Sequence, residues 1–379
     1  MQAGAALLDP GADLASCAAQ VRADQVRTIV DDLIAPDVDR IDREGLYPAE
    51  ALRALGQAGA YASHLARHTH HPARRLSAAI ADMATVGATS MSTAFCVWCQ
   101  DTCGWYLEQT ENAALRHRLQ PGIAHGLALG GTGLSNPVKA LAGIEPFRLR
   151  GTRVQGGWIV TGALPWVSNL GENHWFGSIF EDSDQPGHRI MAMFQCGTND
   201  VAIKQNVHFI ALEGTGTYSV RIRRSFVPDD HILADPIETA LPRIRPGFVL
   251  LQTGMGFGVI SGAIAGMRRD DVTHGHTNRF LPQGADEFEA DAAELWTRVA
   301  DLADHPGQGR DYLRAVLQAR LAVSELTLAA TQAGILHGGA RAYVEGSAVA
   351  RRQREGNFVA IITPSIRQLH QEIASLSSH

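Results

Sequence analysis

Residues 156–169 read Gly-Gly-Trp-Ile-Val-Thr-Gly-Ala-Leu-Pro-Trp-Val-Ser-Asn, a run of β-branched and aromatic side chains that opens with two glycines. A glycine pair favours a turn, and alternating apolar residues after a turn are typical of a β-strand. Residues 218–227 alternate in the same way and end at a Pro-Asp turn. The chain between His125 and Asp235 is therefore predicted to form a β-barrel or β-sandwich insert.

The regions on either side of this insert show helical periodicity. Apolar residues recur at helical intervals from residue 15 to about 122, with breaks at Pro36, Pro48 and Pro72. Amphipathic runs return after the insert over residues 248–267, 287–304, 311–336 and 348–376. The sequence thus predicts an α+β protein with a helical domain (1–124), a middle β-domain (125–237) and a four-helix-bundle-like domain (238–379). A bundle of this kind can hold an extended cofactor against a β-domain.

Composition excludes several classes of protein. The 379 residues are 45% hydrophobic and 19% charged, which is enough to bury more than one core. The net charge is −6 and there is no Lys/Arg-rich run, so nucleic acid or an anionic membrane is not an expected partner. The first nineteen residues lack a basic start and include Asp9, Pro10 and Asp13, which argues against a secretory signal or a membrane span. We expect a cytoplasmic protein.

Three of the five cysteines form the cluster Cys96-x2-Cys99-x3-Cys103. This spacing is compatible with half of a metal or iron–sulfur site, but it also places the three residues on one face of a helix. The neighbouring residues are apolar, which favours buried free thiols.

A second cluster contains His64, His68, His70 and His71. A metal site is one interpretation of it. The nearby Pro72 and arginines, with no acidic or Cys ligand close in sequence, favour a solvated loop instead, and we expect no metal.

Four stretches together are similar to the acyl-CoA dehydrogenase superfamily of flavoenzymes. Residues 156–169 resemble its middle β-domain and residues 211–233 that domain's last strands. Residues 336–343 resemble its Gly-Gly turn and residues 351–355 its Arg-Asp helix. The order and spacing of these stretches carry the resemblance, which runs from about residue 125 to the end and is weaker before. It implies bound FAD, a CoA-thioester or other small-molecule substrate, and a homodimer or homotetramer.

The resemblance also implies which residues contact the flavin. On the family pattern, Trp166, Val167 and Ser168 form a wall against the ring and place a hydroxyl near the flavin N5 atom. Leu134, Ser135 and Asn136 lie at the pyrimidine end of the ring. Without the other motifs, Trp166 would be interpreted as a core residue, and Ser135 and Asn136 as turn residues.

The pyrophosphate clamp departs from the family pattern. Relatives carry an Arg-x-Gln-Phe-Gly segment that reaches the FAD of a neighbouring subunit, where residues 274–284 here read His-Gly-His-Thr-Asn-Arg-Phe-Leu-Pro-Gln-Gly. Arg279 and Gln283 are substitutes at an altered spacing, and FAD is still favoured over FMN. Gly338 and Gly339 allow a close backbone approach to a phosphate, although a turn after a buried helix would use the same glycines.

The position of the catalytic base also departs from the family pattern. Residues 354–365 read Arg-Glu-Gly-Asn-Phe-Val-Ala-Ile-Ile-Thr-Pro-Ser and resemble the family's active-site helix, with Thr363 at the usual place of the catalytic Glu. Some relatives carry that Glu on an earlier helix, at a place near Phe248. Neither side chain can accept a proton near neutral pH. No Asp or Glu lies between Gly356 and Gln371, so the catalytic residues stay unassigned.

Three functions are compatible with this pattern. The first is an FAD-dependent oxidase or oxygenase of specialised metabolism that acts on an activated, CoA-thioester-like substrate and needs no strong protein base. The second is a two-component flavin monooxygenase that receives reduced flavin from a separate reductase and uses O2. The third is a catalytically silent acyl-CoA-binding or structural relative. The retained Trp166 and Ser168 argue against the third, because a silent scaffold has no chemical need for them.

Overall fold

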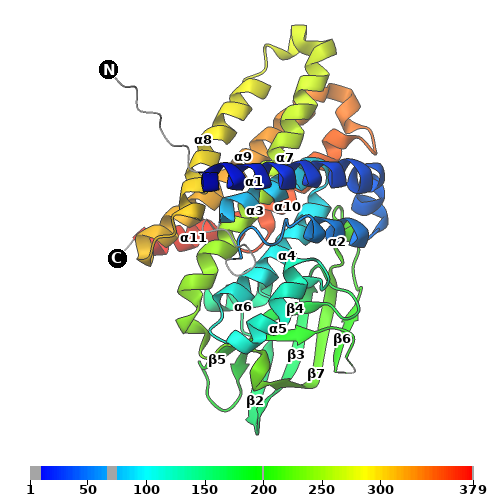
Figure 1. The fold of residues 1–379 in the computed structure, drawn as a ribbon. Helices are drawn as coiled ribbons and strands as arrows, with labels where there is room; N and C mark the ends of the chain where they lie inside the picture. The colour runs from blue at the N-terminus through cyan, green and yellow to red at the C-terminus, as the bar shows by residue number, and fades with distance from the viewer. Residues whose placement is uncertain (1–9, 66–74, 199, 378–379) are drawn as a thin grey trace, which may run out of the picture.

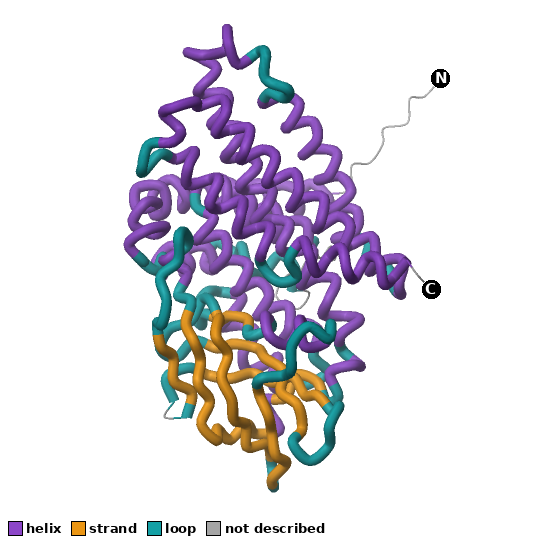
Figure 2. Tube along the Cα trace, turned by 180° about the vertical axis from the view of Figure 1, so that it is seen from behind, coloured by secondary structure: helices purple, strands orange, loops and turns teal. Residues whose placement is uncertain are grey.

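The computed structural model describes residues 10–65, 75–198 and 200–377, with only the backbone of residues 10–16. The strands gather at one end of an elongated molecule and long helices make up the other end (Figures 1 and 2). The mixed α+β architecture predicted from the sequence is confirmed, and the predicted domain boundaries stay predictions.

The N-terminal part is helical. Its elements, where η marks a short 3-10 or π helix, are α1 (Pro10–Ile29), η1 (Val30–Ile34), η2 (Ala35–Asp37), η3 (Arg40–Glu44), α2 (Ala49–Gln57), α3 (Leu76–Thr89), α4 (Met91–Gln109) and α5 (Ala113–Ala124). The expected break at Pro48 is present, because Pro48 precedes α2. At Pro36 the helical backbone changes from the π-helix η1 to the 3-10 helix η2 without a gap. Pro72 lies outside the described residues. Ser90 separates α3 from α4, and its side chain accepts a hydrogen bond from the backbone of Thr93, which caps α4.

The strands form one mixed sheet. They are β1 (Gly130–Thr132), β2 (Leu149–Val154), β3 (Gly157–Val167), β4 (Trp175–Asp182), β5 (Arg189–Gln195), β6 (Val201–Lys204), β7 (Tyr218–Pro228) and β8 (Ile232–Ala234). Their order is β6-β7-β3-β2-β4-β5-β8, and β1 pairs with β4. Among the described strands the two edges, β6 and β8, do not pair with each other, so the sheet is open rather than a closed barrel.

Strand β3 carries the first stretch quoted above. It continues past Gly162 to Val167. Gly162 has a φ of +146°, which a side-chain-bearing residue rarely adopts, and the register with β7 shifts on either side of Gly162. The second shift lies between Leu164 and Val167, so Trp166 sits in an irregular part of the strand.

The middle region also contains helical segments that the sequence analysis did not predict. They are α6 (Ser135–Leu141), η4 (Glu213–Thr215), η5 (Asp229–His231) and η6 (Ile237–Thr239). The composition of residues 125–235 is typical of strands when averaged over the region, so it does not indicate a two-turn helix such as α6.

The C-terminal part contains α7 (Leu241–Asn278), α8 (Ala285–Asp304), α9 (Gly309–Gly338), η7 (Gly339–Tyr343), α10 (Ala348–Ile361) and α11 (Ile366–Ser377). The predicted single helix over residues 348–376 is wrong, because residues 362–365 separate α10 from α11. Thr363 therefore lies between helices and not on one. Pro364 lacks an N–H and disfavours helical backbone at the residue before it, which accounts for the break.

Helix α7 is the centre of the helical half and packs on α3, α4, α9 and α10. Among the described helices it alone is long and apolar enough to cross a membrane, but 83% of that apolar window is buried within the protein. A central core helix has these same properties.

Two residue clusters from the sequence lie in the helical core. Cys96, Cys99 and Cys103 are free and buried on α4, as expected. His64 is also buried, which corrects its assignment to a solvated loop; the other three histidines of that cluster lie outside the described residues. Among the described residues no group of His, Cys, Asp or Glu is arranged to hold a metal ion.

Candidate functional site

A cavity of about 1120 Å³ opens where the sheet meets the helical half. Helices α4, α7, α10 and α11 form the helix side of its lining, and residues from β1, β3 and the segment before β7 form the strand side. The two sides meet where α4 packs on β1. Ligand pockets in proteins usually measure about 300–1,000 Å³, so this cavity has room for a cofactor together with a second small molecule.

The strand side of the cavity presents a row of hydroxyl groups. Ser168 Oγ lies 2.7 Å from Thr217 Oγ1, which lies 2.8 Å from Thr215 Oγ1. Thr132 Oγ1 lies 2.6 Å from the hydroxyl of Tyr106. Because a hydroxyl has one donor and two acceptor sites, this row keeps spare hydrogen-bonding capacity toward a ligand.

Trp166 stands at the same side of the cavity. Its side chain is 42% exposed, although its neighbour Val167 is fully buried. The ring lies 5.7 Å from that of Phe209, centroid to centroid. The bulge in β3 therefore leaves a large flat apolar surface facing the cavity, as a flavin ring requires.

The helix side is a wall of four aromatic rings. Phe95 and Trp98 of α4 stack at 5.6 Å, with their ring planes 8° apart. Phe358 of α10 meets Phe95 edge-on at 4.9 Å, and Phe248 of α7 meets Trp98 edge-on at 5.2 Å. All four residues line the cavity.

Thr363 lies in the cavity wall between the two sides. Its Oγ1 is 3.3 Å from the Oγ of Ser135, so the residue that the sequence resemblance aligns with a catalytic Glu contributes a hydroxyl pair to the cavity wall. The Thr363 carbonyl accepts a hydrogen bond of 2.9 Å from Gln252 Nε2.

Gln252 is in turn held by the buried Arg320. The guanidinium donates from Nε to Gln252 Oε1 at 3.0 Å, from Nη2 to the Val359 carbonyl at 2.7 Å, and from Nη1 to Ser324 Oγ. Arg320 is 0% exposed, and every acceptor it contacts is neutral. Burial lowers the pKa of this arginine to about 10. The arrangement ties the Thr363 backbone to a buried positive charge.

No carboxylate or histidine lines the described part of the cavity wall. Its ionisable residues are Lys139, Arg354, Arg367 and Cys99. Burial raises the pKa of the Cys99 thiol well above its usual range, so the thiol stays protonated. The wall therefore offers hydrogen bonds and positive charge but no group that accepts a proton near neutral pH.

The basic residues differ in how they are held. Arg354 Nη2 lies 2.6 Å from a carboxylate oxygen of the buried Asp42, and Lys139 Nζ lies 3.7 Å from Glu145 Oε1. Arg367 is exposed on α11. These cations are the groups of the cavity wall that suit a phosphate or carboxylate of a ligand.

The structure brings together Ser135, Trp166, Ser168 and Thr363 of the residues singled out from the sequence. Leu134, Asn136 and Val167 are buried, and their side chains do not line the cavity.

Asn136 instead fixes the loop that follows α6. Its amide donates to the Pro146 carbonyl and accepts from the Arg148 backbone N–H, at 2.9 and 3.0 Å. Its side chain is thereby committed to the protein, so only its backbone N–H is left for a flavin, and the assignment of Asn136 stays a prediction.

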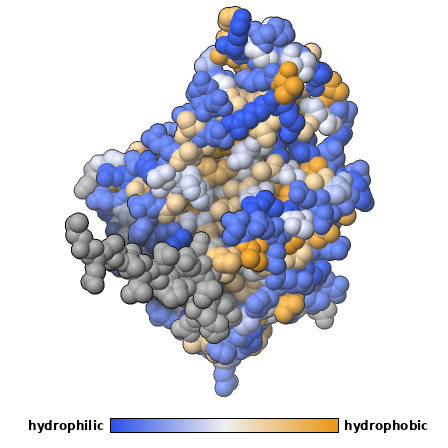
Figure 3. All heavy atoms as spheres, turned by 45° about the horizontal axis from the view of Figure 1, so that its top comes forward, coloured by the Kyte–Doolittle hydropathy of each residue, from blue (hydrophilic) through white to orange (hydrophobic). Residues whose placement is uncertain are grey.

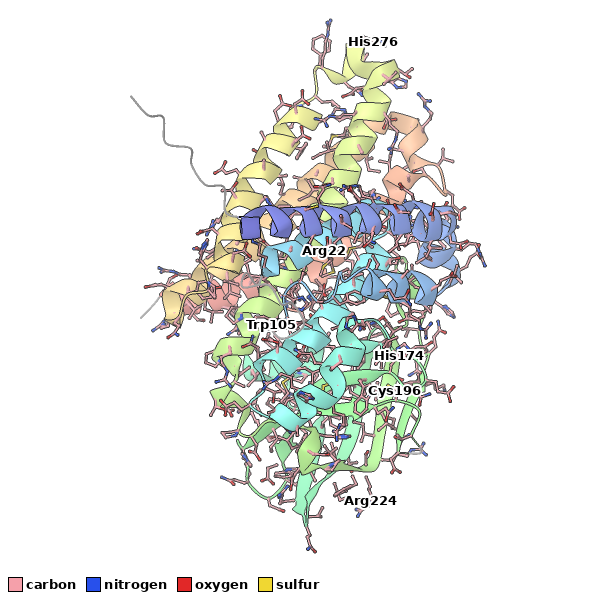
Figure 4. All side chains as sticks on the ribbon, in the orientation of Figure 1. Arg22, Trp105, His174, Cys196, Arg224 and His276 are labelled. Atoms are coloured by element: carbon pink, nitrogen blue, oxygen red, sulfur yellow. The ribbon has the colours of Figure 1, made fainter. Side chains whose placement is uncertain are left out.

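The other four predicted cofactor residues lie at the opposite end of the molecule. Arg279 follows the end of α7, and about 30 helical residues, roughly 45 Å, separate it from Phe248 in the cavity. Figure 4 shows the nearby His276 at the tip of the helices, far from Arg224 on the sheet. Within one chain, Arg279, Gln283, Gly338 and Gly339 therefore do not join the cavity.

Local contacts explain these residues without a ligand. Arg279 lies over the ring of Phe280 at 4.9 Å, and Gln283 accepts a hydrogen bond from His337 through its backbone carbonyl. Gly339 has a φ of +57° and ends α9. The turn interpretation of the glycine pair therefore holds within the single chain.

Large hydrophobic side chains are exposed at this tip. They are Val272, Phe280, Leu336, Tyr343 and Val344, each more than half exposed. Figure 3 turns the upper end of the molecule forward and shows hydrophobic atoms at the surface among polar ones. Exposed apolar groups that gather in one place are typical of an interaction surface.

The aromatic wall and the Arg320–Gln252 connection were missed in the sequence. In the sequence, Phe95 and Trp98 indicate only an apolar helix around the cysteine cluster, and Phe248 marks only a position without a base. The i, i+3 spacing of two large rings on α4 was the available signal. Nothing in the sequence pairs Arg320 with Gln252, which lie 68 residues apart.

Comparison with known proteins agrees with the fold. Residues 19–127 match the family described as "Acyl-CoA dehydrogenase, N-terminal domain". The probable acyl-CoA dehydrogenase FadE25 of Mycobacterium tuberculosis is 25% identical over 251 residues, 63% of this chain and 64% of that protein. The chain thus matches less than two thirds of the length of this curated relative.

Solved structures match over almost the whole chain. Butyryl-CoA dehydrogenase from Megasphaera elsdenii has a TM-score of 0.83 at 14% identity and covers both chains fully. Glutaryl-CoA dehydrogenase from Mycobacterium smegmatis, solved in complex with FADH2, has a TM-score of 0.74 at 14% identity, over 98% of this chain and 95% of its own. Dibenzothiophene monooxygenase from Paenibacillus sp. A11-2 has a TM-score of 0.77 at 15% identity, over 96% and 97%.

Residues 19–127 thus match an acyl-CoA dehydrogenase domain, and the whole chain has the fold of the solved acyl-CoA dehydrogenase structures. The strand side of the cavity fits a flavin, because Trp166 offers a flat apolar wall beside the hydroxyl row that ends at Ser168.

Proposed function

We propose that this protein is an FAD-dependent oxidoreductase that oxidises or oxygenates an activated, CoA-thioester-like substrate without a carboxylate base. One observation carries the proposal: a cavity with a flavin-compatible side contains no Asp, Glu or His in its described wall. Thr363, which the resemblance aligns with the usual base, contributes only a hydroxyl beside that of Ser135. The known fold supports flavin chemistry, and the missing base argues against ordinary dehydrogenation.

FAD, when bound, supplies the transfer of two electrons. The residues of the chain supply binding and orientation. Trp166 provides the ring wall, and the hydroxyls of Ser168 and Thr217 provide hydrogen bonds. Arg367 offers an exposed cation for a phosphate or carboxylate.

The hydroxyl pair limits the chemistry. Ser135 and Thr363 can donate hydrogen bonds to a substrate carbonyl, but neither hydroxyl can hold an abstracted proton near neutral pH. The substrate must then carry a proton that is already acidic, or react without losing one to the protein.

A second candidate is a two-component flavin monooxygenase supplied with reduced flavin by a separate reductase. The size of the cavity favours it, since a wide apolar cavity lets a flavin and a substrate enter in turn. The likeness to dibenzothiophene monooxygenase supports the fold of such an enzyme but not its reaction.

Flavin binding tests the proposal and separates the two candidates. We expect the purified protein to bind oxidised FAD more tightly than FMN when both are titrated and followed by flavin fluorescence. Binding of reduced flavin alone, with turnover only when a reductase is added, would favour the two-component enzyme. Failure to bind any flavin in either redox state would contradict both candidates.

A further inference from the structure

The aromatic wall formed by Phe95, Trp98, Phe248 and Phe358 is not explained by flavin binding on the strand side. Three elements distant in sequence, α4, α7 and α10, each place a ring on it. Adjacent rings are 4.9–5.6 Å apart, so the four form one continuous surface. Three of them are at most 7% exposed, and the small exposed part lines the cavity.

The geometry of this wall favours one class of ligand. Aromatic rings interact with one another through offset-stacked and edge-on contacts, at centroid distances of about 4.5–7 Å, and gain energy beyond the area that they bury. A saturated chain buries area against the same rings without this extra contribution. The wall therefore distinguishes a planar ring from a saturated group of the same size.

The chemistry around the wall points the same way. Within the described part of the chain the indole N–H of Trp98 has no hydrogen-bond partner, but this nitrogen is a donor and is buried. The other rings of the wall are phenyl groups, so the wall offers no acceptor for a polar substituent. The nearest ionisable group on α4 is the Cys99 thiol, which burial keeps protonated. The portion of a ligand that reaches the wall must then be uncharged and apolar.

We propose that the substrate places an aromatic ring against the wall of Phe95, Trp98, Phe248 and Phe358. The inference names the substrate class of the proposed function and rests on it, because it assigns the strand side of the cavity to the flavin. Lys139 and Arg367, elsewhere in the cavity wall, are left for an anionic or polar remainder of the substrate.

A matched pair of probes tests this inference. The two probes are 2-naphthylmethanol and decahydro-2-naphthylmethanol, which share a carbon skeleton and a hydroxyl and differ in aromaticity. Isothermal titration calorimetry of the FAD-loaded protein is expected to show roughly tenfold tighter binding of the aromatic alcohol. Equal affinities, or a preference for the saturated alcohol, would overturn the inference.

Two substitutions on the same helix locate the preference. Phe248→Leu removes a ring of the wall and should lower the aromatic preference by about threefold. Phe257→Leu is the control, since Phe257 lies on α7, is 5% exposed against 4% for Phe248, and packs on Trp296 outside the cavity. It should leave the preference unchanged. Phe358→Leu, at a half-buried ring of the wall, repeats the test if Phe248→Leu does not fold.

The same titration without FAD separates this inference from the proposed function. If the protein binds no flavin but keeps an aromatic preference that depends on Phe248, the ring site stands and the proposed function fails. If FAD binds and the two alcohols bind equally, the flavin assignment stands and the ring site fails. Loss of naphthylmethanol binding on loading with FAD would assign the wall to the flavin and overturn the inference.

Discussion

Replacing Arg320 by Met tests whether the buried arginine stabilises the site. Three hydrogen bonds to neutral acceptors are lost, those to Gln252, Ser324 and the Val359 carbonyl. Hydrogen bonds that involve a charged group contribute about 1.5–3 kcal/mol each, or about 5–9 kcal/mol for the three.

The opposing term is the cost of burying the charge. Burial lowers the pKa of Arg320 from 12.5 to about 10, and this shift corresponds to about 3 kcal/mol that the substitution regains. The difference between the two terms predicts that Arg320→Met lowers the free energy of unfolding by about 2–6 kcal/mol.

Urea unfolding followed by circular dichroism measures this change. Arg314→Met is the control: Arg314 also lies on α9, but its side chain is 39% exposed and pairs with an Asp311 side chain that is 92% exposed. It should change stability by less than about 0.5 kcal/mol. The reasoning is refuted if Arg320→Met is as stable as the wild type or more stable.

Three further predictions concern acid stability, flavin and assembly. Burial lowers the pKa of His64 from 6.5 to about 4, so only the unfolded chain takes up a proton between these values and stability falls as the pH falls. Urea unfolding at pH 7 and pH 4 measures how much unfolding free energy is lost on acidification, and His64→Gln should reduce this loss by about 3 kcal/mol. An unchanged loss would show that His64 is not its source. Ser168→Ala breaks the contact with Thr217 and should weaken flavin binding or slow flavin reduction by about 1 kcal/mol, as titration and stopped-flow absorbance would measure; unchanged values would remove Ser168 from the site. The exposed hydrophobic tip around Phe280 and Tyr343 predicts a homodimer or homotetramer by light scattering, and a monomer with tightly bound FAD would contradict this.

The sequence predicted the architecture because composition and periodicity change sharply along the chain. Helical periodicity before residue 122 and alternation in residues 218–227 both correspond to observed elements. Local exceptions were harder to predict. The break at Thr363 depends on one proline inside a long amphipathic run, and α6 is too short for its periodicity to stand out in a region rich in strands.

The site was predictable only where a motif carried it. Ser135, Trp166, Ser168 and Thr363 meet at one cavity, and the resemblance had indicated each of them. The contact between Arg320 and Gln252 joins two helices, and the four-ring wall joins three. Such contacts depend on the packing angle of helices, which side-chain periodicity within one helix does not determine.

The central claim is that this flavin site has no base at Thr363. Anaerobic mixing of the FAD-loaded protein with a saturated acyl-CoA and an electron-accepting dye tests the claim directly. We predict no dye reduction by the wild type or by Thr363→Gln. Thr363→Glu should gain measurable rate, because a positioned carboxylate contributes about 10²–10⁴-fold to proton abstraction. Rapid dye reduction by the wild-type protein would contradict the claim and show that a base reaches the cavity from elsewhere in the chain.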